Sequence, residues 1–87
     1  MLTFPAKPQR VQHVAGTALE WLSRCRRYRV TRLVEYPAQP YLLCVRDYMP
    51  DGFTPRWDLL SRHRKRAVAF RAASAHTKRE TQAELFS

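Results

Sequence analysis

The sequence predicts an α+β fold, a single small domain made of a helix, a two-stranded antiparallel hairpin and a long second helix. The first observation is length, because 87 residues can bury one modest core but not two. The second is a stretch of strand-forming residues over 28–48, and the third is a helical spacing of apolar residues on either side of it. We expect an extended N-terminal arm over 1–10, the α+β domain over 11–76, and a helix extension or frayed tail over 77–87.

The central hairpin is predicted from residues 28–48, where Val, Thr, Tyr and Leu alternate on both sides of a proline-containing turn. Pro37 and Pro40 bracket the reversal, a place where the missing N–H of proline does not interrupt strand pairing. This turn sets Tyr36 opposite Tyr41. The register that follows pairs Val34 with Leu43, Arg32 with Val45 and Val30 with Asp47.

The two faces of this hairpin differ in polarity. The more apolar face carries Tyr28, Val30, Arg32, Val34, Tyr36, Tyr41, Leu43, Val45 and Asp47. The mixed face carries Arg29, Thr31, Leu33, Glu35, Leu42, Cys44, Arg46 and Tyr48. Because an isolated hairpin is marginally stable in water, helices or a partner chain must cover at least one face. On the mixed face, Arg29, Arg46 and Tyr48 can meet solvent or a ligand.

A first helix is predicted from Gln9 to Arg26, with Pro8 suited to its first turn. Its apolar stripe at helical spacing consists of Val11, Val14, Ala15, Ala18, Leu19, Trp21, Leu22 and Cys25. Ahead of this helix, Leu2 to Phe4 can add a short edge strand to the hairpin or act as an apolar latch on the core.

A second helix is predicted to begin at Thr54 and Pro55, a hydroxyl cap followed by a proline in the first turn. It runs to Ala75, and nothing in the sequence stops it before Leu85. Its apolar side is predicted to hold Leu59, Leu60, His63, Ala67, Phe70 and Ser74. Its solvent side is predicted to hold Arg62, Lys65, Arg66, Ala69, Ala73 and His76.

The net charge is the strongest signal in the composition. It is +9 at pH 7, from 16 basic and 7 acidic residues, and 13 of the basic residues are Arg. Guanidinium groups bind phosphate in a bidentate manner and stack on bases, so this bias favours an anionic partner over solubility alone. There is no apolar run of about 18 residues and no signal-peptide pattern, so we expect a cytoplasmic protein without a membrane partner.

No catalytic or cofactor-binding motif is present in the sequence. It lacks paired carboxylates within one element, a nucleophile elbow and a glycine loop for phosphate. Cys25, Cys44, His63 and His76 lack the closely spaced ligand pairs of a zinc site, and the two cysteines are expected to be buried free thiols. We therefore predict a protein that is not an enzyme and has no metal or cofactor, with a small nuclease based on His63 as a weaker alternative.

The function predicted from these observations is non-enzymatic nucleic-acid binding, dominated by contacts to the phosphate backbone. The predicted contact residues are Arg24, Arg26, Arg27 and Arg29 around the end of the first helix, and Arg62, Lys65 and Arg66 on the outer face of the second helix. The choice between DNA binding and RNA binding, and between single and double strands, stays open.

The alternative is a small protein-interaction inhibitor or adaptor of phage or plasmid type, acting on a host-defence or nucleic-acid-processing complex. Its Arg residues would bind an acidic protein surface, because Arg is also a frequent anchor at protein interfaces. The predicted partner-binding residues are Trp57, Arg64 and Arg71. Apolar residues on both hairpin faces and the alanine-rich side of the second helix are also compatible with a homodimer.

Overall fold

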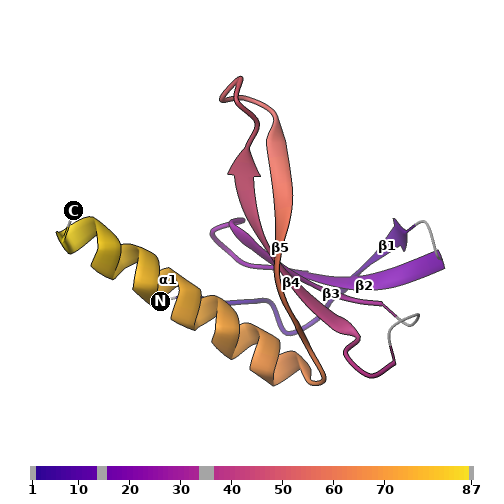
Figure 1. Ribbon diagram of the computed structural model, residues 1–87. Helices are drawn as coiled ribbons and strands as arrows, with labels where there is room; N and C mark the ends of the chain where they lie inside the picture. Colours follow the sequence, from indigo (N-terminus) through magenta and orange to yellow (C-terminus); the bar gives the residue numbers. More distant parts are fainter. Residues whose placement is uncertain (1, 14–15, 34–36, 87) are drawn as a thin grey trace.

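The computed structural model shows a five-stranded antiparallel sheet with one helix packed against it (Figure 1). It describes residues 2–13, 16–33 and 37–86, with the backbone alone at 13 and 81–86. The elements are β1 (Gln9–His13), β2 (Gly16–Leu22), β3 (Tyr28–Arg32), β4 (Tyr41–Tyr48), β5 (Pro55–His63) and α1 (Arg66–Phe86). In the part of the chain that the structure describes, neighbouring strands in the sheet are also neighbours in sequence. The fold is therefore mostly sheet, and the predicted order of helix, two-stranded hairpin and long helix is wrong.

The first predicted helix, from Gln9 to Arg26, is instead the hairpin of β1 and β2 and the turn that follows it. Gly16 begins β2 with a φ of 127°, a conformation that residues with a side chain rarely adopt and that a helix does not contain. Leu19 and Trp21 then alternate toward the covered face of the sheet. Val14 and Ala15 of the predicted stripe lie outside the described residues.

The predicted central hairpin is confirmed as antiparallel pairing of β3 with β4, but its register is wrong. Arg32, not Tyr36, faces Tyr41, and Val30 faces Leu43. β3 ends at Arg32, earlier than expected, and β4 begins at Tyr41. The register differs from the prediction by an even number of residues, which leaves the paired side chains of β3 and β4 on their predicted faces. Val34, Glu35 and Tyr36 lie outside the described residues.

The second predicted helix begins too early, because residues 55–63 form the edge strand β5. Thr54 caps no helix, since its N–H and its hydroxyl both donate to the carboxylate of Asp51 in the β4–β5 turn. Pro55 stands at the start of an edge strand, where its lack of an N–H is tolerated. The helix from Arg66 to Ala75 is confirmed as part of α1.

The side of α1 that packs on the sheet is shifted from the predicted one. Phe70 of the predicted apolar side packs against the core, but Ala69 and Ala73, expected in solvent, are both 0% exposed. Their small side chains allow the helix backbone to lie close to β3 and β4. The core beneath them consists of Trp21, Tyr28, Val30, Leu43 and Val45. The predicted apolar face of the hairpin is thus the face that the helix covers.

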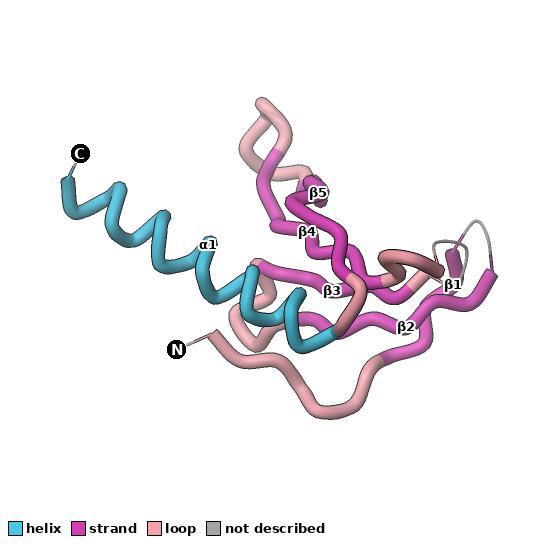
Figure 2. The backbone as a smooth tube through the Cα atoms, turned by 60° about the horizontal axis from the view of Figure 1, so that its bottom comes forward, coloured by secondary structure: helices cyan, strands magenta, loops and turns pink. Residues whose placement is uncertain are grey.

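The N-terminal arm acts as an apolar latch, and its residues 2–4 add no strand to the sheet. The ring of Phe4 stacks on Phe70 of α1 with centroids 4.3 Å apart, and Phe70 meets Trp21 edge-on at 6.3 Å. The N–H of Arg24 donates to the carbonyl of Thr3, which ties the arm to the β2–β3 turn. Figure 2 shows this arm passing α1 on its way to β1.

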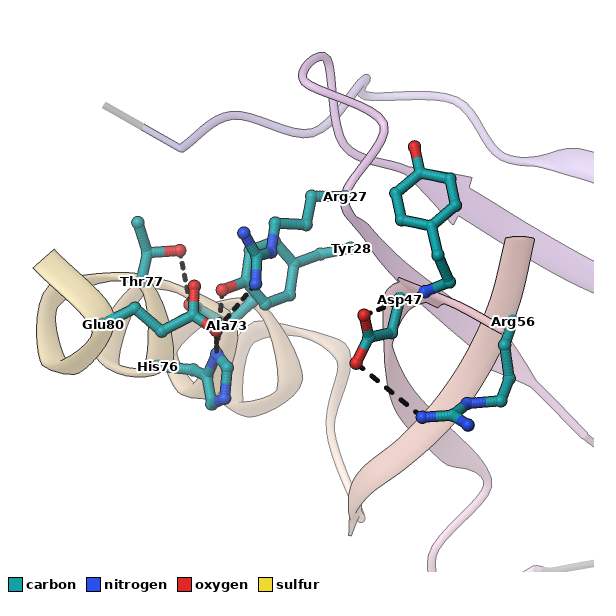
Figure 3. A network of polar contacts seen from close by, with 9 residues as sticks. Arg27, Tyr28, Asp47, Arg56, Ala73, His76, Thr77 and Glu80 are labelled. Carbon is teal, nitrogen blue, oxygen red and sulfur yellow. Dashed lines mark hydrogen bonds and ion pairs between the residues drawn. The ribbon is translucent and has the colours of Figure 1, made fainter. Parts of the chain in front are cut away.

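A chain of polar contacts fixes the middle of α1 to β3 (Figure 3). Tyr28 is almost fully buried, and its hydroxyl lies 2.8 Å from Nδ1 of His76. The same His76 nitrogen lies 3.6 Å from the Glu80 carboxylate, to which Arg27 donates at 2.8 Å. A buried tyrosine hydroxyl thereby obtains the polar partner that it requires.

Replacing Ala73 by Leu should destabilise the protein, because the larger side chain has no room between α1 and the sheet. We expect a loss of about 1–3 kcal/mol in the free energy of unfolding, measured by urea denaturation. The matched control is Ala75→Leu, at an exposed position of the same helix, where the change should stay within about 0.5 kcal/mol. Equal effects at the two positions would contradict the orientation of the helix.

Candidate nucleic-acid interface

The face of the sheet opposite α1, here called the open face, presents a mixture of basic, apolar and aromatic side chains. Paired residues on neighbouring strands share a face and successive residues alternate, so the register defines its members. They are Gln9, Val11, Ala18, Glu20, Leu22, Arg29, Thr31, Leu42, Cys44, Arg46, Tyr48, Pro55, Trp57, Leu59 and Arg62. The sheet is strongly twisted, and the β4–β5 hairpin rises away from the direction of β1 and β2 (Figure 1).

Two hollows adjoin each other on this side of the sheet. The first has a volume of about 310 Å³ and is lined by Val11, Gln12, Glu20, Arg29, Thr31, Leu33, Leu42 and Cys44. The second has a volume of about 440 Å³ and is lined by Pro5, Lys7, Gln9, Glu20, Leu22, Ser23, Arg24 and Arg26. Glu20 lines both hollows, so the two lie side by side between the N-terminal arm and the centre of the sheet.

Arg29 occupies the centre of the open face. Its guanidinium carbon lies 4.5 Å from the ring centroid of Trp57, a cation–π contact that restrains both side chains. Its Nη1 atom lies 3.8 Å from the Glu20 carboxylate, beyond hydrogen-bonding distance. Its Nε atom is buried and has no hydrogen-bond partner. The guanidinium also interacts with the neighbouring Cys44 thiol.

Four of the seven predicted phosphate-binding residues lie on this side of the sheet. Arg29 and Arg62 belong to the open face, and Arg24 and Arg26 line the second hollow from the β2–β3 turn. Sequence reasoning missed Lys7, which lines the same hollow, and left Arg46 out of the site. Arg46 has a signal in the sequence, because the strand period of two puts it on the mixed face of the hairpin, whereas nothing in the sequence puts Lys7 of the N-terminal arm beside this hollow.

The other three predicted phosphate-binding residues lie elsewhere. Arg27 turns toward α1, where it pairs with Glu80. The guanidinium of Arg66 lies 5.4 Å from the Trp21 ring, on the side of the sheet that the helix covers. Lys65 belongs to the turn between β5 and α1. The predicted shared helix face of Arg62, Lys65 and Arg66 is wrong, because the segment crosses a strand, a turn and a helix start.

The predicted partner-binding residues do not form one cluster. Trp57 lies on the open face against Arg29, whereas Arg64 follows the opposite end of β5. At about 3.3 Å per strand residue, the two lie roughly 20 Å apart. Arg71 is an exposed residue of α1.

The β2–β3 turn holds Arg26 in the left-handed region, with a φ of 63°. The N–H of Arg26 donates to the carbonyl of Ser23, which closes the turn. A residue with a side chain at this φ costs about 1 kcal/mol relative to Gly. The cation is thus kept at the rim of the second hollow in spite of a backbone preference for glycine.

The two thiols have opposite environments. Cys44 is buried as predicted, and burial raises the pKa of its thiol although the charge of Arg29 acts against this. Cys25 is exposed, so its predicted burial is wrong. Partial burial acts to raise the pKa of Cys25, but the hydrogen bond with Ser23, backbone hydrogen bonds and the charge of Arg27 bring it below its ordinary value.

Comparison with protein families, curated proteins and solved structures finds no match. Among the described residues, no three His, Cys, Asp or Glu side chains gather in a way that could hold a metal ion. The described part of the chain also contains no helix long and apolar enough to cross a membrane. The geometry of the open face therefore carries the functional argument.

Cys25 should be alkylated by iodoacetamide faster than Cys44 near neutral pH, because it is exposed and forms the thiolate more readily. Mass spectrometry of the single-thiol variants Cys44→Ser and Cys25→Ser measures the two rates separately. The rate at Cys25 should fall as the pH is lowered through its pKa. Faster alkylation of Cys44 would show that the open face is not packed as described.

Proposed function

We propose that the protein is a non-enzymatic nucleic-acid-binding protein that contacts phosphates along the open face. The observation that carries this proposal is the one-sided arrangement of the sheet. The helix covers one face, while the other has two adjoining hollows, one lined by Arg29 and the other by Lys7, Arg24 and Arg26. The proposed contact residues are Lys7, Arg24, Arg26, Arg29, Arg46 and Arg62. The proposal includes a cytoplasmic location, where nucleic acid is accessible.

The charge balance of the open face supports this choice of surface. Glu20, the single carboxylate among its described members, forms an ion pair with Arg29 at 3.8 Å. The described members of this face still include more arginines than carboxylates, and this excess of positive charge favours a polyanion on this side.

The strained Arg26 adds independent support. A turn position with a φ of 63° is best filled by Gly or Asn, and an arginine there lowers stability. Residues in such conformations cluster at binding sites, where the surrounding structure offsets their cost. A phosphate contact at the rim of the second hollow accounts for the arginine.

Charge reversal at Arg24 and Arg26 tests the proposal. The variant Arg24→Glu/Arg26→Glu should lose about tenfold or more in affinity for labelled oligonucleotides at low salt, measured by fluorescence anisotropy. Wild-type binding should weaken steeply between about 50 and 200 mM salt. Circular dichroism checks that the variant keeps the fold.

The matched control is Arg71→Glu/Arg79→Glu, at two exposed positions of α1. Each pair of reversals removes 2 × 2 charges, so both variants go from +9 to +5. The control should lose clearly less affinity than the turn variant. Equal losses would mean that binding follows net charge alone and would remove the open face from the proposal.

A protein-interaction adaptor is the second candidate function, and the β4–β5 hairpin is the observation that favours it. The exposed large hydrophobic residues of the described chain all belong to this hairpin, namely Tyr48, Met49, Phe53, Leu59 and Leu60. Phe53 is 86% exposed at the tip, where Asp51 accepts hydrogen bonds from the N–H groups of Phe53 and Thr54. An ordered turn with an apolar tip suits insertion into a protein pocket. Absence of oligonucleotide binding at low salt would leave this candidate in first place.

A further inference from the structure

Glu20 is the least expected member of a surface proposed to bind phosphates. It lies on β2 opposite Thr31 of β3 and lines both hollows, with its side chain 17% exposed. A carboxylate at this place repels a phosphate backbone and lowers affinity for any strand that crosses it. Removing the Glu20 carboxylate would raise the affinity of a surface that bound phosphates alone.

The ion pair with Arg29 leaves part of the hydrogen-bonding capacity of this carboxylate unused. The Nη1 atom of Arg29 lies 3.8 Å from the Glu20 carboxylate, close enough for an ion pair but too far for a hydrogen bond. A carboxylate that accepts and a guanidinium that donates thus stand side by side with hydrogen-bonding capacity left over. This pair of side chains matches a ligand that presents hydrogen-bond donors next to an acceptor.

The 310 Å³ hollow around this pair has the size and lining of a site for one planar base. Its volume is at the lower end of the range for small-ligand pockets. Leu33 and Leu42 supply apolar walls, and Cys44 is a buried thiol whose pKa is raised by that burial. Trp57 holds the Arg29 guanidinium from one side, which limits the orientations that the donor can take. The site is therefore partly preorganised.

We propose that this hollow receives one unpaired guanine of a single-stranded nucleic acid, an inference that rests on the proposed function. The Watson–Crick edge of guanine presents two adjacent N–H donors, N1–H and the N2 amino group, beside the acceptor O6. Glu20 accepts from the two donors, and Arg29 donates to O6. Adenine, cytosine, thymine and uracil do not offer two neighbouring donors on that edge. In a duplex this edge is already paired, so the site requires a single strand.

The experiment measures anisotropy of labelled oligo(dT) strands that carry one central dG, dA, dC or inosine, with a duplex of the dG strand for comparison. The wild-type protein should bind the dG strand about five- to hundredfold more tightly than the dA strand and the duplex, as expected for bidentate recognition. Inosine lacks the N2 amino group and should lose most of that preference. This part of the experiment changes the ligand and leaves the protein unchanged.

The variant Glu20→Gln separates guanine recognition from phosphate contact, because the substitution should affect the two in different ways. It should lose the preference for dG, while its affinity for plain oligo(dT) stays the same or rises because a negative charge has been removed. The matched control is Glu80→Gln, the same change at a carboxylate on α1 that pairs with Arg27. This control should keep the dG preference of the wild-type protein.

The outcomes separate the inference from the function on which it rests. Equal binding of all single strands by the wild-type protein, or tighter binding of every strand by Glu20→Gln, would overturn base reading and leave phosphate contact standing. Preference for the duplex would overturn it as well. Failure to bind any of the probes at low salt would instead overturn the proposed nucleic-acid function itself.

Discussion

The close packing of α1 on the sheet through Ala69 and Ala73 is the contact on which the rest of this structure depends. A larger residue at either position would lift the helix from Val30 and Leu43 and expose the core. The polar bond between Tyr28 and His76 then holds the helix in one position along β3. Since one helix covers one face, the opposite face of the twisted sheet keeps two hollows, and the proposed function depends on that asymmetry.

The distribution of charge follows the same division. Carboxylates on α1 and on the β4–β5 hairpin lie beside arginines, as Glu80 does with Arg27 and Asp58 with Arg56. Such exposed pairs contribute little stability, but they reduce the positive potential where they occur. On the open face, Arg29 is held by Trp57 instead of by a hydrogen-bonded carboxylate. The surface thus combines charge, an aromatic ring and a hollow, which are the features that single-stranded nucleic acids use.

The faces of the central hairpin could be predicted from sequence because the alternation in β3 and β4 has one interpretation. The first two strands could not be predicted in this way. Ala18 lies on the open face, while Leu19 and Trp21 pack under the helix, but the same three residues also satisfy a helical spacing. In β5 a bulge opposite Leu43 and Cys44 leaves Leu60 without a partner and interrupts the alternation.

The candidate site was predictable in part, for a related reason. Arg29 and Arg62 were identified by their charge, and any fold that exposed them would have kept them as candidates. Glu20 was missed because its importance depends on being the neighbour of Arg29, a relation that exists only in the register of β2 with β3. Charge can be read from composition, whereas the side chains that share a hollow follow from strand pairing.

The most direct test of the central claim, that the open face is the binding surface, is an NMR titration of the labelled protein with a single-stranded oligonucleotide. We expect the largest shifts at the side-chain N–H groups of Trp57 and Arg29 and at the amides of β2, β3 and the β2–β3 turn. The amides of α1 beyond Phe70 should shift little. Shifts concentrated on α1, with the Trp57 indole signal unchanged, would contradict the account.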